Sequence, residues 1–245
     1  MQALLLASLI KLVSLQASFI SCNHACVQAL LLIGGNIVIF GIVGNKGGIG
    51  KTTLSVHLAC WLSERGKKVA LIDSDPQGSS SRWVRAVLPS LRVEKLTISD
   101  DIIETAPQLA EEYDCVVVDG LPGLSDITRA ILLIADRAIL PCGPSQLDLL
   151  AVFEAVRVLR QAQQIRGGKP DALIVPNRLQ SRYRLSKELM LALESLGVPI
   201  TSGLGLRQPF ADAPGQSTLV WRMNGAGQAT EEIEKLLTEV VRDGE

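Results

Sequence analysis

The sequence predicts an α/β fold in which helices cover both faces of a doubly wound, mostly parallel sheet. Short apolar runs alternate with helical patterns from Ile37 to about Ile200, the order of repeated β-α-β units. A glycine-rich segment follows the first apolar run and precedes a helical pattern, as in a phosphate-binding loop. The chain has 245 residues, 47% of them hydrophobic, which suits one such domain with a buried central sheet.

The glycine-rich segment has the residues that a phosphate-binding loop requires. Asn45–Thr53 reads NKGGIGKTT and connects the apolar run Ile37–Val43 to a predicted helix at Leu54–Glu64. Glycine lets the backbone turn tightly, so that successive N–H groups face phosphate oxygens, and the helix adds its positive N-terminal end. The predicted nucleotide-binding residues of this loop are Gly47, Gly48, Ile49, Gly50, Lys51, Thr52 and Thr53.

Two polar side chains of the loop suit the charge of a nucleotide. We expect Lys51 to contact the β- and γ-phosphates, and Thr52 to offer its hydroxyl to Mg²⁺, which bridges the same phosphates. The usual P-loop pattern has glycine five places before Gly50; here that place is Asn45, and Gly44 lies one residue earlier. A second lysine is therefore more informative than the glycine pattern.

That second lysine, Lys46, gives the loop the order K-G-G-x-G-K-T. This order resembles the deviant Walker A motif of the ParA/MinD family of ATPases. The resemblance extends in chain order from about Ile37 to the end, and it implies ATP and Mg²⁺ as cofactors and a homodimer with ATP at the interface. It also implies that Lys46 crosses the interface and acts in catalysis on the partner's nucleotide. In an ordinary P-loop protein, Lys46 would be a solvated loop charge.

Two carboxylates follow the next apolar run, Lys68–Ile72. The segment Asp73–Gly78 reads DSDPQG and resembles the D-x-D-P-Q segment of the same family. The resemblance implies that Asp75 positions the water that attacks the γ-phosphate, by orienting it or accepting its proton. It also implies that Asp73 supports the waters of Mg²⁺. Taken alone, the segment would be interpreted as a turn, because its residue types are frequent after strands.

A third acidic position ends the run Asp114–Asp119, which reads DCVVVD. The apolar residues predict a central parallel strand that is covered on both faces. Asp119 matches the Walker B position of the family, which implies that it holds Mg²⁺ through a water. The following segment, Gly120–Gly123, has one proline where the family usually has a proline-rich segment.

The later strands and loops resemble the base-binding half of the family. Ala138–Asp148 contains the P-S-x-x-D run that is typical of partition ATPases. The strand Asp171–Asn177 ends where the family hydrogen-bonds adenine, and an amide can both donate and accept; a turn residue is the alternative for Asn177. Pro209 and Phe210 are expected at the edge of the base, although core packing also explains Phe210.

The net charge of −1 gives no case for nucleic acid in the chain as a whole. One basic cluster matches the resemblance, because partition ATPases bind DNA without sequence preference through basic residues late in the chain. The alternative is the solvated face of an amphipathic helix, since leucines recur with helical spacing between positions 185 and 196. The predicted DNA-binding residues are Arg178, Arg182, Arg184, Lys187 and Arg207.

The five cysteines form no metal-binding pattern. Cys60, Cys115 and Cys142 lie in apolar runs, where a free thiol behaves as a small hydrophobic group. Cys22 and Cys26 are spaced almost as metal ligands are, but they lack a second pair. An iron–sulfur relative is therefore not expected.

The first 35 residues are apolar and lie upstream of the resemblance. They lack the basic start of a secretory signal, and Lys11 and several polar residues interrupt the roughly 20 apolar residues that a spanning helix requires. A mis-assigned start near Ile37 is favoured, with a hydrophobic or membrane-associated extension as the alternative. The sequence is thus divided into residues 1–35, of doubtful status, and a single ParA-like ATPase domain at residues 36–245.

Together, these features resemble those of a cytoplasmic, nucleoid-associated partition ATPase. Such a protein binds DNA as an ATP-dependent homodimer and positions a plasmid, a chromosome or a carboxysome through a ParB-like or McdB-like adaptor that stimulates hydrolysis. The alternatives are a MinD-like membrane-surface positioning ATPase and a module that binds ATP without hydrolysing it. A protein of the cell-division branch would end in a basic amphipathic helix, but residues 231–245 hold six acids against Lys235 and Arg242, so we expect this helix to pack on the sheet. A membrane-surface factor would otherwise rely on the apolar first 35 residues.

Overall fold

The computed structural model describes residues 39–180 and 184–242, with the backbone alone at residues 184–187. Apart from Arg242, the described residues belong to the compact unit Ile37–Val241. The expectations for residues 1–35 lie outside the described range, so the division of the chain at residue 35 stays a prediction.

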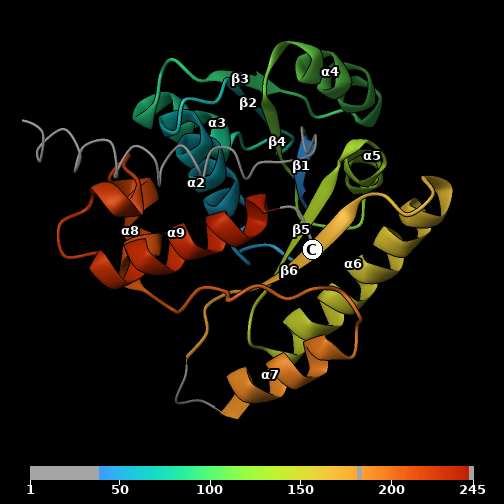
Figure 1. Cartoon of the computed structure of the whole chain (residues 1–245), viewed down its shortest axis with the longest axis vertical. Coiled ribbons are helices and arrows are strands. Elements are labelled where there is room, and N and C mark those ends of the chain that lie inside the picture. Colours follow the sequence, from blue (N-terminus) through green and yellow to red (C-terminus); the bar gives the residue numbers. More distant parts are fainter. Residues whose placement is uncertain (1–38, 181–183, 243–245) are drawn as a thin grey trace, which may run out of the picture. The chain divides into compact units, whose positions relative to one another are not determined.

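A six-stranded sheet forms the centre of the described chain (Figure 1). Its strand order is β3-β2-β4-β1-β5-β6, and every neighbouring pair is parallel. This arrangement confirms the predicted α/β fold. The strands are β1 (Ile39–Ile42), β2 (Val69–Asp73), β3 (Arg92–Lys95), β4 (Cys115–Asp119), β5 (Arg137–Cys142) and β6 (Asp171–Pro176).

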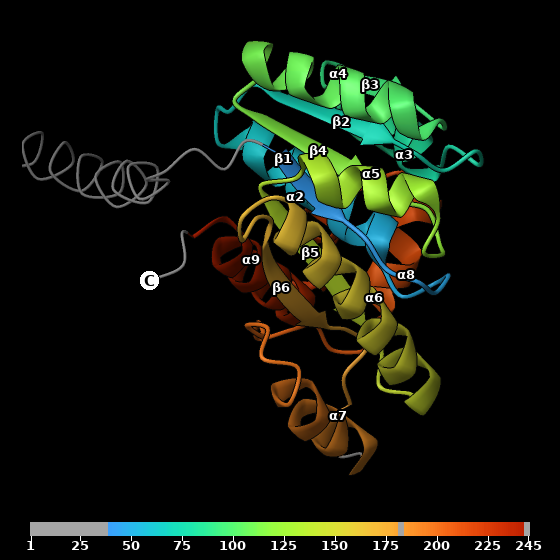
Figure 2. The ribbon, with the colours of Figure 1, turned by 90° about the vertical axis from the view of Figure 1, so that its right-hand side faces the viewer.

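Helices cover both faces of this sheet (Figure 2). One core cluster unites α4, α5, α6 and α7 with one face, while α2 and α3 pack against strands from the other. The helices are α2 (Lys51–Glu64), α3 (Ser79–Val87), α4 (Ser99–Glu112), α5 (Asp126–Ile134), α6 (Gln146–Ile165), α7 (Arg184–Glu194), α8 (Gln208–Gly215), the 3₁₀ turn η1 (Val220–Arg222) and α9 (Gly227–Val241).

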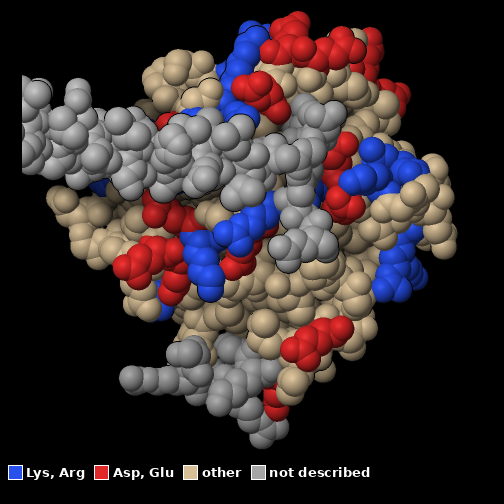
Figure 3. All heavy atoms as spheres, viewed as in Figure 1, with Lys and Arg blue, Asp and Glu red and all other residues tan. Residues whose placement is uncertain are grey.

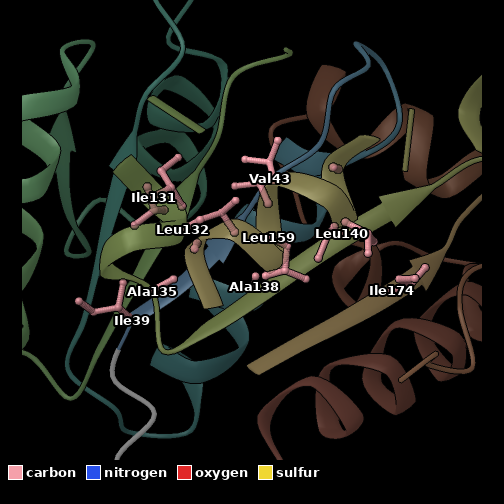
Figure 4. Packing of buried hydrophobic residues seen from close by; sticks show 14 of the residues in the cluster. Ile39, Val43, Ile131, Leu132, Ala135, Ala138, Leu140, Leu159 and Ile174 are labelled. Carbon is pink, nitrogen blue, oxygen red and sulfur yellow. The ribbon is translucent and has the colours of Figure 1, made fainter. Parts of the chain in front are cut away.

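Alternate residues of each strand face the two helical layers, because side chains of a β-strand point in opposite directions in turn. In β5, Ala138 and Leu140 join the cluster with α4 to α7, whereas Ile139 is buried outside it. Figure 4 shows Leu159 of α6 beside these strand residues, and Ile131 of α5 belongs to the same cluster. Burial of each large apolar side chain contributes about 1.5–3 kcal/mol, and the two covered faces account for the nearly continuous apolar strands.

Two features differ from the sequence-based expectations. The structure adds β3, which lies at the edge of the sheet and pairs with β2. Its sequence, RVEK, is polar and partly exposed, so it has no apolar run that would predict it. The first helix begins at Lys51 rather than Leu54, because the last residues of the glycine loop already have helical backbone.

The terminal helix α9 packs on the domain, as expected. The buried side chain of Arg137, in β5, donates a hydrogen bond to the carbonyl oxygen of Val240, in α9, over 2.7 Å. Among the described residues, no helix is both long and apolar enough to cross a bilayer. The apolar stripe of α9 is buried at Ile233, Leu236, Leu237, Val240 and Val241.

A buried histidine joins α2 to the segment that follows α8. Nδ1 of His57 lies 2.7 Å from the carbonyl oxygen of Thr53, and the backbone N–H of Val220 donates to Nε2 over 3.3 Å. Because a carbonyl oxygen only accepts and an N–H only donates, the ring is neutral with its proton on Nδ1. Burial lowers the pKa of His57 to about 4.

We predict that His57 makes the stability of the domain depend on pH. Its pKa is about 4 in the folded chain and ordinarily 6.5, so its full contribution is present above pH 6.5 and is lost as the pH falls toward 4. Between about pH 7 and about pH 5, the free energy of unfolding of the wild type should fall by roughly 2 kcal/mol relative to that of His57→Phe, whose ring does not titrate.

Urea unfolding of both proteins at the two pH values measures this difference. The comparison with His57→Phe is needed because burial raises the pKa of Asp119 to about 6, which stabilises the folded chain as the pH falls. An equal pH dependence in the two proteins would show that His57 takes up a proton as easily in the folded chain as in the unfolded one.

Candidate nucleotide-binding site

The glycine loop lies between the end of β1 and the start of α2, at the carboxyl edge of the sheet. Gly48 and Gly50 have φ angles of 73° and 100°, a left-handed backbone that favours glycine. Space is also lacking at Gly50, because a Cβ there would collide with the side-chain amide of Asn177. The loop therefore requires glycine at this position on two grounds.

Asn177, directly after β6, is bound to the glycine loop. Its Nδ2 donates to the carbonyl oxygen of Ile49 over 2.7 Å, and its Oδ1 accepts from the N–H of Arg178 over 2.8 Å. The residue is 8% exposed. The amide thus fixes the loop against the end of β6, while its expected contact with adenine stays a prediction.

Lys51 is buried beneath the loop and donates from Nζ to the carbonyl oxygen of Lys46 over 2.8 Å. Burial lowers the pKa of Lys51, whereas the carboxylates of Asp119 and Asp75 raise it and offset part of that effect. Lys51, the predicted phosphate-binding lysine, therefore lies close enough to Asp119 and Asp75 to interact with both electrostatically.

Asp119 is hydrogen-bonded to two hydroxyls of α2. Its Oδ2 accepts from Oγ1 of Thr52 over 2.9 Å, and its Oδ1 accepts from Oγ of Ser55 over 2.8 Å. Burial raises the pKa of Asp119 to about 6, although the hydroxyls favour its charged form. Sequence analysis paired Thr52 with Asp119 through Mg²⁺ but did not identify Ser55.

Asp73 lies beside Asp119 because β2 and β4 are paired in register at these two residues. The carboxylate of Asp73 accepts the N–H groups of Asp75 and Ser81 over 3.1 Å and 2.8 Å. The oxygens of Thr52, Asp73 and Asp119 form a hard donor set, which fits Mg²⁺.

Asp75 lies in a turn, as the alternative interpretation of its segment suggested. Its Oδ1 accepts the N–H of Gln77 over 2.8 Å, and Gly78 follows with a φ of 65°. The turn leaves Asp75 partly exposed at the end of β2. The two interpretations are compatible, because this turn holds the carboxylate near Lys51.

Lys46 forms an ion pair within its own chain. Its Nζ donates to Oδ1 of Asp148 over 2.6 Å, with 41% of the lysine side chain exposed. Asp148 also forms a capping box with Ser145 at the start of α6. Burial raises the pKa of Asp148, but the hydrogen bonds from Lys46 and Ser145 outweigh it and hold the pKa below its usual value. This partner of Lys46 was missed, because the two residues are far apart in the sequence.

A cavity of about 180 Å³ opens beside the glycine loop. Phe210 lines it and Pro209 is not among its lining residues, while the expected contacts of both with a base stay predictions. Arg207 also lines it, and its guanidinium is bound to Glu232 over 2.7 Å. The cavity is lined by Gly50, Thr53, Leu54, Asn177, Arg178, Leu204, Gly205, Leu206, Arg207, Phe210 and Ala211.

The predicted DNA-binding residues are only partly described. Arg178 is exposed after β6, and Arg184 and Lys187 lie on α7 with their backbone alone described. Arg182 lies outside the described residues. Glu232 compensates the charge of Arg207, so Arg178 is the residue of the predicted cluster that the described structure shows exposed and without an ion pair to another described side chain.

Comparison with known proteins decides the family. The profile described as the "CobQ/CobB/MinD/ParA nucleotide binding domain" matches residues 40–220. The chain belongs to this family. A ParA/MinD-type relative, "Maintenance of carboxysome distribution protein A" of Halothiobacillus neapolitanus, is 31% identical over 206 residues, which cover 80% of this chain and 93% of that protein. "Protein IncC" of Escherichia coli is 26% identical and covers 78% of this chain and 65% of its own length.

Solved structures of ParA/MinD-type proteins share the fold. A complex of a Cyanothece McdA variant with ATP has a TM-score of 0.69 at 17% identity and covers 86% of this chain and 99% of its own. The cell division protein MinD of Aquifex aeolicus has a TM-score of 0.67 at 17% identity, with coverage of 85% and 98%. The sheet and its helices therefore form the P-loop ATPase fold of these proteins.

We predict that Mg²⁺-dependent ATP binding by this ParA/MinD-type domain weakens in acid. Mg²⁺ requires the charged form of Asp119, whose pKa is about 6, so protons compete with the ion as the pH falls through 6. From about pH 7.5 to about pH 5, the affinity should fall about tenfold beyond the change caused by protonation of ATP itself.

Calorimetric titration with MgATP at a series of pH values measures this effect, with Asp119→Asn as the control. The variant should bind more weakly but show only the pH dependence of ATP. The same pH dependence in both proteins would contradict a role for Asp119 in binding Mg²⁺.

Proposed function

We propose that the protein is a ParA-type positioning ATPase, which dimerises around MgATP, binds nucleoid DNA in that state and releases it after hydrolysis. The observation that supports this best is the position of Lys46. It stands half-exposed outside a phosphate site formed by Lys51, Thr52, Asp73 and Asp119. Its Nζ is bound to Asp148 at the start of α6, and its exposed part is accessible to a second subunit.

Hydrolysis would be attack of water on the γ-phosphate. Bound Mg²⁺ would neutralise charge on the β- and γ-phosphates, held by the hydroxyl of Thr52 and, through water, by Asp119 and Asp73. Lys51 compensates charge that develops on the phosphate oxygens, and Asp75 orients the water or accepts its proton. Burial of Lys51 strengthens its interaction with a phosphate, because little water screens it.

Lys46 would change partners when the dimer forms. Its present ion pair with Asp148 is exposed on the lysine side, and Asp148 keeps its hydrogen bonds from Ser145 when Lys46 leaves. Exchange of Asp148 for the partner's nucleotide therefore costs little. Only ATP, not ADP, would offer the γ-phosphate that makes the exchange favourable, so the nucleotide would act as a switch.

DNA would bind at the β6 edge of the sheet. Arg178 and the basic residues of the α7 region follow β6, while α4 follows β3 at the opposite edge. Figure 3 shows acidic side chains gathered over α4. This separation of charge orients the chain toward the DNA backbone despite its net charge of −1. The exposed acids of α4 are Asp100, Asp101, Glu104, Glu111 and Glu112.

A carboxysome is the favoured cargo, because two carboxysome-distribution proteins are 31% and 29% identical across 93% and 94% of their length. The adaptor would then be McdB-like, in a cytoplasmic, nucleoid-associated system. Plasmid or chromosome partition with a ParB-like adaptor is the second candidate, supported by the match to a probable ParA of Thermus thermophilus at 25% identity. A MinD-like membrane role is less favoured, because the apolar stripe of α9 is buried.

Mixing two inactive variants tests the shared active site. Lys46→Gln keeps Asp75, and Asp75→Ala keeps Lys46, so a mixed dimer has one complete site built from both subunits. Each variant alone should lose ATP turnover while binding MgATP. An equal mixture should recover about a quarter of the wild-type rate, because half of random dimers are mixed and each has one working site of two.

The matched control mixes Lys46→Gln with the double variant Lys46→Gln/Asp75→Ala, which supplies no lysine and should recover nothing. Absence of recovery in the first mixture would place Lys46 in its own subunit's site. Unchanged turnover by Lys46→Gln alone would remove this lysine from catalysis.

Charge reversal tests the DNA surface. Arg182→Glu/Arg184→Glu should weaken ATP-dependent binding to random duplex DNA and reduce the slope of log affinity against log salt by about 2, because roughly one counterion is released per phosphate contact. Fluorescence anisotropy across a salt series measures both quantities. The control Lys67→Glu/Lys68→Glu carries the same charge change at the amino end of β2 and should leave the slope unaltered. Equal slopes in the two variants would place the DNA surface elsewhere.

A further inference from the structure

We propose that His57 is a positioning residue for the base-binding wall of the site. It holds the segment of residues 207–222 against α2 and thereby sets affinity for the base, without touching the nucleotide. This inference rests on the proposed function, because it takes the 180 Å³ cavity beside the glycine loop as the place of the base.

Hydrogen bonds tie His57 to its own helix and to η1. The carbonyl oxygen of Thr53, on α2, accepts from Nδ1, and the N–H of Val220, in η1, donates to Nε2. Thr53 itself lines the cavity. Loss of the imidazole would leave the N–H of Val220 buried without its acceptor, which disfavours the present position of the segment.

Three aromatic rings surround the imidazole edge to face. Their centroids lie 5.4 Å from that of His57 for Trp83, 6.2 Å for Phe210 and 5.3 Å for Trp221, with interplanar angles of 85°, 73° and 75°. These rings come from α3, α8 and η1. Phe210 also lines the cavity, so His57 contacts the wall through one residue on α2 and another on α8.

The rings are anchored around His57 by polar contacts. Nε1 of Trp83 donates to the carbonyl oxygen of Thr218 over 2.8 Å, and Nε1 of Trp221 donates to Glu64 over 2.9 Å. Arg222 is also paired with Glu64 at the end of α2. Residues 207–222 are therefore bound to Glu64 at the protein surface, and the fully buried His57 makes a polar contact with them in the interior.

The phosphate half of the site is held by other residues. Thr52 and Ser55 are bound to Asp119, and Ile49 is bound to Asn177. None of these hydrogen bonds involves His57. A change at His57 should consequently affect the base more than the phosphates, which distinguishes a positioning role from a general loss of structure.

A ligand without a base separates the two effects. We would measure the affinities of wild type and His57→Phe for MgATP and for magnesium tripolyphosphate by calorimetry. His57→Phe keeps a ring among the aromatics but loses both hydrogen bonds. It should bind MgATP about tenfold more weakly and tripolyphosphate with unchanged affinity. His57→Gln, which returns an acceptor toward Val220, should recover part of the MgATP affinity and carries the comparison if His57→Phe does not fold.

Val156→Ala is the matched control, because it removes buried methyl groups from α6 on the opposite face of the sheet. It should change neither affinity. Equal losses for the two ligands in the His57 variants, or no loss for MgATP, would overturn the proposal. Failure of the wild type to bind either ligand would instead refute nucleotide binding itself, and with it this inference.

Discussion

The buried carboxylate of Asp119 is the contact on which the arrangement of the phosphate site depends. A carboxylate in this position is costly unless its oxygens are hydrogen-bonded, and hydroxyls of Thr52 and Ser55 satisfy them. Both hydroxyls belong to the first turns of α2, so the requirement fixes that helix, and the glycine loop before it, against the end of β4. Because β2 and β4 are parallel and Asp73 is paired with Asp119, Asp73 lies next to Asp119 at the end of β2. The end of β4 thus fixes the place where, in the proposed function, a metal ion and a phosphate would bind.

Other residues hold the part of the site where the base of the nucleotide would bind. Asn177 fastens the loop to β6, and His57 fastens residues 207–222 to α2. Lys46 belongs to neither half, since its ion pair with Asp148 is partly exposed at the outer side of the loop. In the proposed switch, Lys46 would change partner beside two parts of the site that are each held by hydrogen bonds.

Local sequence signals predicted the parts of the structure that depend on burial and backbone conformation. Apolar runs predicted β1, β2, β4, β5 and β6, and the glycines predicted the loop, because these signals lie within a few residues of each other. The polar edge strand β3 was missed, since it has no apolar pattern. The contacts of Lys46 with Asp148 and of His57 with Val220 were missed because these partners lie about 100 and 160 residues away in the sequence. Asn177 was identified as a site residue, but its hydrogen bond to Ile49 could not be predicted without the fold.

The central claim is that the γ-phosphate controls DNA binding. The most direct measurement is the affinity of the full chain for random-sequence duplex DNA at fixed salt, with MgATP, with MgADP and without nucleotide. We expect tight binding to DNA with MgATP, and no tight binding with MgADP or without nucleotide. Equal DNA binding in the three conditions, or binding in none, would contradict this claim. The γ-phosphate, which distinguishes the dimer-competent state from the monomeric one, would then have no effect on the DNA surface.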